Sequence, residues 1–318
     1  MRSVLLVKTS SLGDVIHNLP VVTDLRRIWP HLQIDWVVEE SFADIPRLHP
    51  GVHQIIPVAV RRWRKHLGER ATWREMRAFG VNLRARHYDF VIDTQGLVKS
   101  ALITRAAHGL RCGYAREVAR EPLAALAYDR HYVIPRTAHA VERNRWLAAA
   151  AAGYVADTPL SYGIHTHAAQ PGWVPAVPYS VLLTATSRDD KLWQEDHWIV
   201  LGRALAERGL LSVLPAGSAR ERERAERLAA QIPGAVVAPP SRIDALAAVM
   251  AQAQCVVGVD TGLTHLAAAL GRPVVAVFVA TDPGLTGVYA GPQAVNLGTA
   301  GLGPTPQQVL ERLQRWLP

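Results

Sequence analysis

The sequence predicts an α/β protein made of two Rossmann-like βα domains that face each other across a cleft. Short runs of apolar and β-branched residues alternate with longer amphipathic stretches, a pattern typical of parallel sheets covered by helices on both faces. The alternation stops over residues 165–178, where three prolines and a glycine predict an irregular linker, and then begins again. At 318 residues, the chain is long enough for two domains of ordinary size.

Each predicted element follows from a local pattern. Runs such as 3–8 and 255–259 are short, apolar and rich in valine, which favours buried strands. Longer stretches that mix charged and apolar residues favour helices. The predicted strands are 3–8, 34–38, 89–93, 179–184, 210–214, 255–259 and 273–278. The predicted helices are one that begins near Asp14 and those at 198–208, 219–231, 261–270 and 305–317.

These elements place an N-terminal domain at residues 1–165 and a C-terminal domain at 178–303, and we allow the last segment, 304–318, to pack back on the N-terminal domain. The net charge of +8 is confined to the first half of the chain. Residues 1–160 contain 23 Lys and Arg against 15 Asp and Glu, whereas residues 161–318 contain 12 of each kind. A basic domain beside a neutral one predicts an anionic partner for the basic domain.

The composition also predicts a compartment. Cys112 and Cys255 lie far apart, which offers neither a disulfide framework nor a zinc-binding spacing and fits a reducing cytosol. The first apolar run stops at Lys8, which is too short for a signal peptide, and no apolar stretch reaches the length of a membrane span. We therefore expect a soluble cytoplasmic protein whose contact with a membrane, if it has one, is peripheral.

Ligands of parallel sheets bind beyond the carboxyl ends of the strands, so the loops at these ends are candidate sites. The first loop runs from Lys8 to Asp14 and contains Ser10 and Ser11. In this position, Asp14 could serve as a general base that takes a proton from a hydroxyl group. The simpler interpretation is that Asp14 caps a helix N-terminus, and the spacing alone favours that interpretation.

The loop after the first strand of the second domain is rich in oxygen and nitrogen ligands. Thr186 and Ser187 with Lys191 nearby could hold an oxygen-rich ligand, above all a phosphate. The alternative is a solvated loop in which Lys191 pairs with Asp189 or Asp190. The two interpretations are about evenly balanced on the residues alone.

A second strand-to-helix turn in this domain gives a sharper signal. Asp260, Thr261 and Gly262 precede a helix whose N-terminal amides could bind an anion, and His265 follows within one turn. The alternative makes Thr261 an N-cap and His265 a surface residue. In another strand-to-helix turn, Glu221 could accept hydrogen bonds from ribose hydroxyls, although an ordinary surface glutamate is favoured on the sequence alone.

A basic run with interleaved tryptophans lies in the first domain. Its members are Arg61, Arg62, Trp63, Arg64, Lys65, Arg70, Trp73, Arg74 and Arg77. Nucleic acid, membrane phosphates and a phosphorylated substrate are all suitable partners, and a solvated helical face is the alternative. Because the run lies in the basic domain and no nucleic-acid motif accompanies it, an anionic substrate is the better prediction. No dinucleotide fingerprint, Walker A motif or metal-binding pattern is present, so we predict no cofactor and no metal.

Three of these segments together resemble glycosyltransferase family 9, the lipopolysaccharide heptosyltransferases. They are 8–17, 188–191 and 260–265, followed by 281–284, and the similarity extends to about Tyr289. Each string is short, but their order and spacing are typical of the family, and of its type I enzymes more than its type II enzymes. The resemblance implies a GT-B fold with an acceptor-binding N-terminal domain and an ADP-sugar-binding C-terminal domain.

The resemblance also implies a reaction. It is the inverting, metal-independent transfer of L-glycero-D-manno-heptose from ADP-heptose to the first Kdo of Kdo2-lipid A, on the cytoplasmic side of the inner membrane. The implied catalytic residues are Asp14 as the base and Lys191. The implied donor contacts are Thr186, Ser187, Lys191, Glu221, Asp260, Thr261, Gly262 and His265. The residues considered for the acceptor are Ser10, Ser11, Arg61, Arg62 and Arg64.

Other functions remain to be separated from this one. A type II heptosyltransferase or another family 9 transferase would keep most of the same residues. A non-catalytic nucleotide-sugar-binding protein would need only the second domain's site, so that Asp14 would be expendable. A basic protein that binds nucleic acid would show tight, salt-sensitive DNA binding and no sugar transfer.

Overall fold

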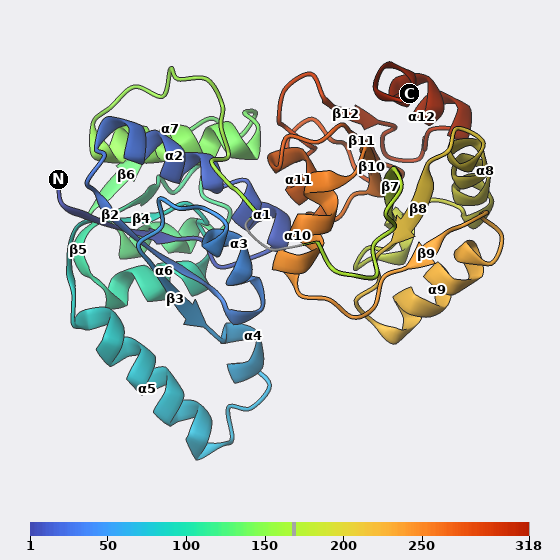
Figure 1. The fold of residues 1–318 in the computed structure, drawn as a ribbon. Coiled ribbons are helices and arrows are strands. Elements are labelled where there is room, and N and C mark those ends of the chain that lie inside the picture. The colour runs from blue at the N-terminus through green and yellow to red at the C-terminus, as the bar shows by residue number, and fades with distance from the viewer. Residues whose placement is uncertain (167–169, 318) are drawn as a thin grey trace. The chain divides into compact units, whose positions relative to one another are not determined.

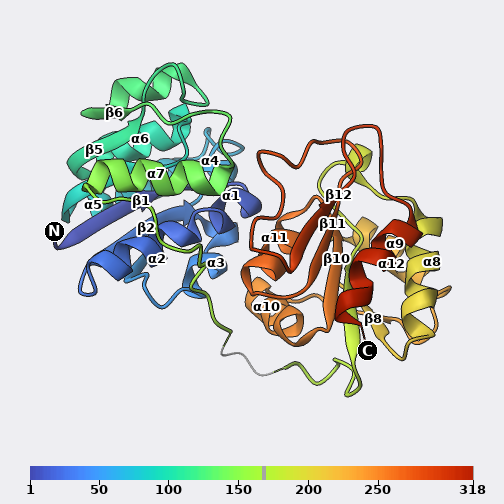
Figure 2. The same cartoon turned by 90° about the horizontal axis from the view of Figure 1, so that it is seen from above.

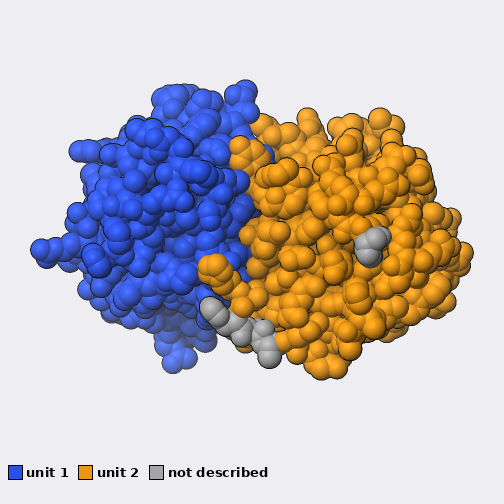
Figure 3. All heavy atoms as spheres, turned by 45° about the horizontal axis from the view of Figure 1, so that its top comes forward, with its two compact units in different colours: residues 1–164 blue, residues 165–318 orange. Residues whose placement is uncertain are grey.

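The computed structural model describes residues 1–166 and 170–317, and these divide into two compact units. Unit 1 is Met1–Ile164 and unit 2 is His165–Pro318; Figure 3 shows them in two colours. Each unit is built on a six-stranded sheet in which every pair of neighbouring strands is parallel. The predicted α/β class is confirmed. Part of the predicted linker, residues 167–169, lies outside the described residues.

The sheet of unit 1 has the strand order β3-β2-β1-β4-β5-β6. The bounds are Ser3–Val7 for β1, Gln33–Glu39 for β2, Gln54–Val58 for β3, His87–Asp93 for β4, His108–Tyr114 for β5 and Arg130–Tyr132 for β6. The last four residues of the central strand β1 are all buried. Because side chains alternate between the two faces of a strand, β1 is covered on both faces. This explains why its sequence is apolar throughout and not alternating.

Helices cover both faces of this sheet (Figure 1). The helices α2 and α7 contact each other on one face, while α5 and α6 pack on the other. Leu5 and Val7 of β1 meet Leu83 of α5 and Ile103 of α6 in one core. The helices are α1 (Leu12–Ile16), α2 (Leu19–Ile28), α3 (Asp44–Arg47), α4 (Val60–Trp63), α5 (Arg70–Arg84), α6 (Val98–Ala106) and α7 (Ala140–Ala152), with 3-10 turns η1 (Glu40–Phe42) and η2 (Pro122–Ala127).

The sheet of unit 2 has the order β12-β11-β10-β7-β8-β9. Numbered from its own first strand, this is the same order as in unit 1, and it is that of a Rossmann fold. The bounds are Tyr179–Leu183 for β7, Leu211–Leu214 for β8, Val236–Val237 for β9, Cys255–Val259 for β10, Val274–Val277 for β11 and Ala294–Leu297 for β12.

The helices of unit 2 also form two layers. The helices α10 and α11 contact each other on one face of the sheet, and α8, α9 and α12 lie on the other (Figure 2). Trp198 of α8 and Leu228 of α9 share the core on that second face. The helices are α8 (Glu195–Ala206), α9 (Ala219–Ala229), α10 (Ile243–Gln252), α11 (Gly262–Ala269) and α12 (Pro306–Leu313), with 3-10 turns η3 (Asp189–Lys191) and η4 (Gln314–Trp316).

The C-terminal helix corrects one expectation. We allowed residues 304–318 to pack back on the N-terminal domain, but α12 packs against α8 within unit 2. Val309, Leu310 and Leu313 form one apolar face of α12 and are buried in the core of unit 2. Burial of that face fixes the helix there, and Thr305 caps its N-terminus by accepting from the Gln308 amide at 3.3 Å. The last residue, 318, lies outside the described residues.

Both sheets reverse their strand order between two central strands. In unit 1 the reversal falls between β1 and β4, and in unit 2 between β7 and β10. At such a switch point, the loops after the two strands diverge to opposite faces and leave a crevice at the carboxyl edge of the sheet. The segments that follow three of these strands, β1, β7 and β10, carry ten of the fourteen predicted site residues.

Candidate active site

Asp14 lies in the short helix α1, directly after β1. Ser11 is the N-cap of this helix, and Asp14 is its third residue. The interpretation of Asp14 as the N-cap is therefore wrong. Asp14 Oδ2 accepts hydrogen bonds from the Ser11 amide at 3.0 Å and from the Ser11 hydroxyl at 3.1 Å. These bonds hold the carboxylate to the loop and leave Oδ1 available for another partner.

The surroundings of Asp14 favour its ionised form. Burial alone would raise the pKa of this carboxyl, but the charges of Lys8 and Arg120 and the hydrogen bonds from Ser11 outweigh burial and lower the pKa below its usual value. The Arg120 guanidinium lies 3.4 Å from Asp14 Oδ2. Asp14 is therefore a carboxylate ready to accept a proton.

Lys8 is a buried ammonium group in the loop after β1. It is 4% exposed, and its Nζ donates to the Thr94 carbonyl at 2.8 Å and to Asn144 Oδ1 at 3.3 Å. Burial lowers its pKa to about 8, although the nearby charge of Asp14 acts in the opposite direction. Lys8 is thus tied to the loop after β4 while its charge acts on Asp14.

The loop after β4 contributes residues that the sequence analysis missed. Gln95 Oε1 accepts from the amides of Thr9 and Ser10, at 2.7 and 3.2 Å, and so fixes the loop after β1. Lys99, in the first turn of α6, donates to Ser10 Oγ at 2.6 Å. The signal was available, because residues 94–99 follow the predicted strand 89–93 at a carboxyl end, where ligands of such sheets bind.

The three arginines considered for the acceptor, Arg61, Arg62 and Arg64, have different surroundings. Arg62 is already paired with Glu40 at 3.1 Å and Glu75 at 2.8 Å, and these carboxylates raise its pKa. The Arg61 guanidinium lies over the Phe42 ring at 4.9 Å. The charges of Arg61 and Arg64 lower the pKa of Lys99, the residue that donates to Ser10 Oγ.

Lys99 has a buried acidic neighbour. Burial lowers the pKa of Lys99, while the charge of Glu39 raises it and those of Arg61 and Arg64 lower it. Glu39 is 1% exposed; its Oε1 accepts from the Arg61 amide at 3.0 Å, and its Oε2 has no hydrogen-bond partner among the described residues. A polar, mainly cationic edge of unit 1 therefore surrounds Ser10.

Lys191 forms the centre of the site in unit 2. Its Nζ donates to Asp260 Oδ2 at 2.6 Å, and Thr281 donates to the same oxygen at 2.8 Å. The predicted alternative, a pair with Asp189 or Asp190, is wrong: Asp190 pairs with Arg188, and Asp189 pairs with Arg220 at 2.8 Å.

The loops after β7 and β10 are joined through Asp260. The Thr186 hydroxyl donates to the Asp260 carbonyl at 2.9 Å. Burial would raise the pKa of the Asp260 carboxyl, but His265, Lys191 and Thr281 lower it well below its usual range. Asp260 therefore holds Lys191 and Thr281 in place as a fixed negative charge.

The start of α11 carries the remaining predicted donor residues. Thr261 stands at the N-cap position without a side-chain capping bond, and Gly262 begins the helix. His265 is 7% exposed and its Nε2 lies 3.9 Å from Asp260 Oδ1, so the interpretation of His265 as a surface residue is wrong. The first amides of α11 thus face the same loop as Asp260 and carry the positive end of the helix dipole.

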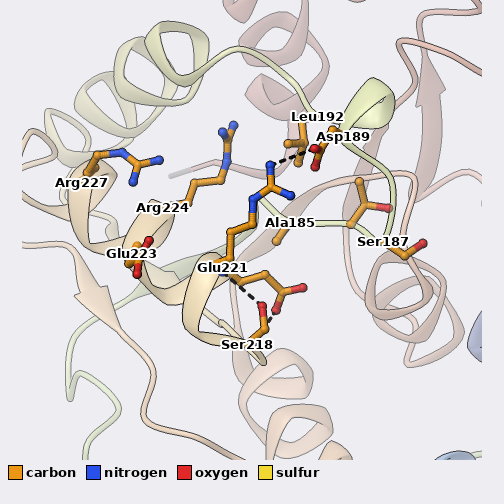
Figure 4. A pocket seen from close by; sticks show the side chains of 11 residues that line it. Ala185, Ser187, Asp189, Leu192, Ser218, Glu221, Glu223, Arg224 and Arg227 are labelled. Carbon is orange, nitrogen blue, oxygen red and sulfur yellow. Dashed lines mark hydrogen bonds and ion pairs between the residues drawn. The ribbon is translucent and has the colours of Figure 1, made fainter.

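Glu221 borders a pocket of about 390 Å³ beside α9 (Figure 4). Its Oε2 accepts from the amides of Gly217 and Ser218, at 2.7 and 3.0 Å, while Ser218 Oγ accepts from the Glu221 amide at 3.2 Å. Glu221 is thus part of a capping box and not a solvated surface glutamate. Thr186 and Ser187 line the same pocket.

The described residues offer neither a metal-binding cluster nor a membrane-spanning helix. Among residues 1–166 and 170–317, no three His, Cys, Asp or Glu side chains come together in a way that could hold a metal ion. In the same part of the chain, no helix is both long and apolar enough to cross a bilayer.

Two Rossmann-like units with polar loops at both switch points are the architecture of GT-B glycosyltransferases. The family model for glycosyltransferase family 9 (heptosyltransferase) matches residues 76–315. The chain is 49% identical over 294 residues to lipopolysaccharide heptosyltransferase 1 of Escherichia coli K12. This alignment covers 92% of each protein. The chain therefore belongs to glycosyltransferase family 9 and is a glycosyltransferase enzyme.

Solved structures agree with this assignment. The E. coli heptosyltransferase WaaC with ADP is 45% identical and superposes with a TM-score of 0.92 over 98% of this chain and 99% of that one. The same enzyme with ADP-2-deoxy-2-fluoro heptose is 44% identical, with a TM-score of 0.90 over the same shares. Similarity to lipopolysaccharide heptosyltransferase 2 of E. coli K12 is lower, at 25% identity over 99% of this chain and 98% of that one.

Proposed function

We propose that this enzyme transfers L-glycero-D-manno-heptose from ADP-heptose to the first Kdo of Kdo2-lipid A, with inversion and without a metal. The 49% identity to the type 1 enzyme of E. coli K12, against 25% to the type 2 enzyme of the same organism, supports the type I reaction. The observation that carries the chemistry is Asp14, a partly buried carboxylate kept ionised at the switch point of unit 1.

The donor would bind at the switch point of unit 2. Lys191 and the first amides of α11 supply positive charge and hydrogen-bond donors for a diphosphate. Thr186 and Ser187 line the adjoining pocket with hydroxyl groups. Glu221 uses Oε2 for the helix cap, which leaves Oε1 to accept from ribose hydroxyls.

Inversion needs a single displacement at the anomeric carbon of heptose. Asp14 accepts the proton of the attacking Kdo hydroxyl as its oxygen forms the new bond to that carbon, and the bond to the phosphate oxygen breaks. ADP leaves with the negative charge, which the Lys191 ammonium stabilises once it exchanges Asp260 for the phosphate. Because these groups carry the charge of ADP, the proposed step needs no metal.

The acceptor would bind at the carboxyl edge of the unit 1 sheet. Kdo carries a carboxylate and lipid A carries phosphates, and both suit Arg61, Arg64 and Lys99. Ser10 and Ser11 offer hydroxyl groups beside Asp14. Arg62 fits this role less well, because two carboxylates already neutralise it. A lipid acceptor would hold the enzyme at the cytoplasmic face of the inner membrane as a peripheral protein.

One assay tests the proposal. Release of ADP from ADP-heptose is measured with no acceptor, with Kdo2-lipid A, and with Kdo2-lipid A that already carries one heptose, each with and without EDTA. We expect release with Kdo2-lipid A only, unchanged by EDTA. Release with the heptosylated acceptor alone would favour a type II enzyme, and ADP-heptose binding without release would favour a non-catalytic protein. Loss of activity in EDTA would contradict the metal-independent step.

A further inference from the structure

The proposed reaction leaves one basic surface of unit 1 unused. We call it the basic tip and define it as residues 65–77, the α4–α5 connection after Arg64 and the first turns of α5. Figure 1 shows this part of α5 projecting away from the sheet of unit 1. The rest of α5 is anchored, because Phe79 and Leu83 pack into the core cluster on that face of the sheet.

Two large apolar side chains are exposed together at the basic tip. Trp73 is 57% exposed and Leu67 is 49% exposed. The Trp73 indole Nε1 donates to the Leu67 carbonyl at 2.8 Å, so the ring lies against the turn that carries Leu67. This bond satisfies the polar atom of the indole and leaves the apolar part of the ring to solvent. The two side chains form a small exposed apolar patch.

Basic side chains surround this apolar patch. Four exposed basic residues belong to the basic tip, and none of them forms an ion pair within residues 1–166 and 170–317; they are Lys65, Arg70, Arg74 and Arg77. The two carboxylates of the segment are already engaged. Glu69 accepts from His66 at 2.7 Å, and Glu75 accepts from Arg62 and from the Trp63 indole, both at 2.8 Å. The basic tip therefore has uncompensated positive charge.

We propose that the basic tip docks on the surface of an anionic phospholipid bilayer. Tryptophan prefers the interfacial region of a bilayer, and leucine beside it adds apolar area that can enter the acyl boundary. The arginines and the lysine would meet lipid phosphates at the same depth, and their long apolar stems can reach past the aromatic ring. A phosphate-binding surface for nucleic acid would not need an exposed leucine at its centre.

This inference rests on the proposed function only in that a lipid-linked acceptor lies in a membrane. The docking surface is distinct from the proposed acceptor contacts, because Trp73, Leu67, Arg70, Arg74 and Arg77 have no part in the reaction. Its ligand is bulk phospholipid and not the acceptor. Binding can therefore be measured on vesicles that contain no acceptor, and transfer can be measured on a soluble acceptor that contains no acyl chains.

The test is co-sedimentation of the full-length protein with vesicles of phosphatidylglycerol and phosphatidylethanolamine, and with vesicles of phosphatidylcholine alone. We expect binding to the first and little to the second, with a loss of affinity as salt rises. Trp73→Ala and Leu67→Ser should each weaken binding by about tenfold. Each of Arg70→Gln, Arg74→Gln and Arg77→Gln should weaken it by roughly fivefold.

Trp146→Ala is the matched control, because Trp146 is an exposed tryptophan, 37% accessible, on α7 of the same unit. It should bind vesicles like the unchanged protein. Trp73→Ala should keep its kcat on an acceptor without acyl chains, which also shows that it folds. Equal binding by Trp73→Ala and Trp146→Ala, no preference for the anionic vesicles, or tighter binding to duplex DNA than to vesicles would each overturn the inference. Failure of transfer by the unchanged protein would overturn the proposed function instead.

Discussion

Asp14 can take a proton only if its carboxylate is ionised, and its immediate neighbours keep it so. Burial opposes ionisation, but Lys8, Arg120 and the two bonds from Ser11 act against burial and lower the pKa. A low pKa also makes Asp14 an intrinsically weak base. Its contribution would therefore come from its fixed position against the attacking hydroxyl more than from its basicity.

The first prediction concerns Asp14→Asn. The amide keeps the size of the side chain and cannot accept the proton, so kcat should fall by roughly a hundredfold to ten-thousandfold. The dissociation constant of ADP should not change, because every proposed donor contact belongs to unit 2. Steady-state kinetics and calorimetric titration with ADP measure the two quantities. Turnover near that of the unchanged enzyme would exclude Asp14 as the base.

The sequence identified the residues of the site better than it identified their hydrogen-bond and ion-pair partners. The strings that hold Asp14 and Lys191 could be found because they are contiguous and follow predicted strands. Their partners are distant in sequence: Lys191 and Asp260 are 69 residues apart, and Lys99 and Ser10 are 89 apart. Only the pairing of β7 with β10 and of β1 with β4 brings them together. A single sequence therefore offered only the local Asp189 and Asp190 as ion-pair partners of Lys191, and both pair with arginines instead.

The second prediction concerns Lys8→Met. Burial lowers the folded pKa of Lys8 to about 8 from 10.5, so between these pH values the unfolded chain binds more protons than the folded one. Folding stability due to Lys8 should therefore rise with pH in this window, by about 3 kcal/mol in the free energy of unfolding. Below pH 8 Lys8 is protonated in both states, and its contribution should be constant.

The difference in unfolding free energy between the two proteins, measured by urea denaturation from pH 7 to 10.5, isolates this contribution. The unchanged protein should gain stability relative to Lys8→Met only as pH rises through about 8, the folded pKa. A difference that is flat over the whole range would contradict the depressed pKa. A difference that shrinks with pH would mean that the folded state favours the charged form.

At the scale of elements, the sequence predicted the strands that carry the site. The strands recognised in unit 1 are the three at its centre, β2, β1 and β4, and those recognised in unit 2 are the four at its centre, from β11 to β8. Inner strands are covered on both faces, so they are mainly apolar, although β2 and β4 also contain aspartates. Three of the missed strands have local irregularities: β9 has two residues, β3 contains Pro57, and β5, which pairs with β4 and β6, contains two glycines.

The third prediction compares two cations on neighbouring elements, α6 and α4. Lys99→Gln removes the charge beside Ser10, so the KM for Kdo2-lipid A should rise by about tenfold, as expected for one charged hydrogen bond. Arg62→Gln removes an arginine that Glu40 and Glu75 already neutralise, so the same KM should change by less than about twofold. The KM for ADP-heptose should be unaffected in both variants.

An acceptor whose Kdo carboxylate is converted to a methyl ester sharpens this comparison. If Lys99 meets that carboxylate, the unchanged enzyme should lose affinity for the ester, and Lys99→Gln should barely distinguish the two acceptors. Equal losses in both proteins would place the carboxylate elsewhere. An effect of Arg62→Gln as large as that of Lys99→Gln would return Arg62 to the acceptor site.

At the scale of the whole molecule, the same Rossmann strand order occurs twice with different residues at its switch points. Unit 1 places a carboxylate and several cations there, while unit 2 places a lysine held by an aspartate and an uncapped helix start. The net charge of +8 follows this division, because the excess lies in the first half of the sequence. Under the proposed function, this excess matches an anionic acceptor and a membrane surface, and not the nucleotide.

The fourth prediction uses this division of labour. A ligand protects the amides of the unit that binds it, because it stabilises only the states in which its site is formed. In hydrogen exchange, ADP alone should protect segments 184–192, 217–221 and 260–265 of unit 2. The acceptor should protect the loops 8–14 and 94–99 of unit 1. Protection of 8–14 by ADP, with none at 260–265, would reverse the assignment of donor and acceptor to the two units.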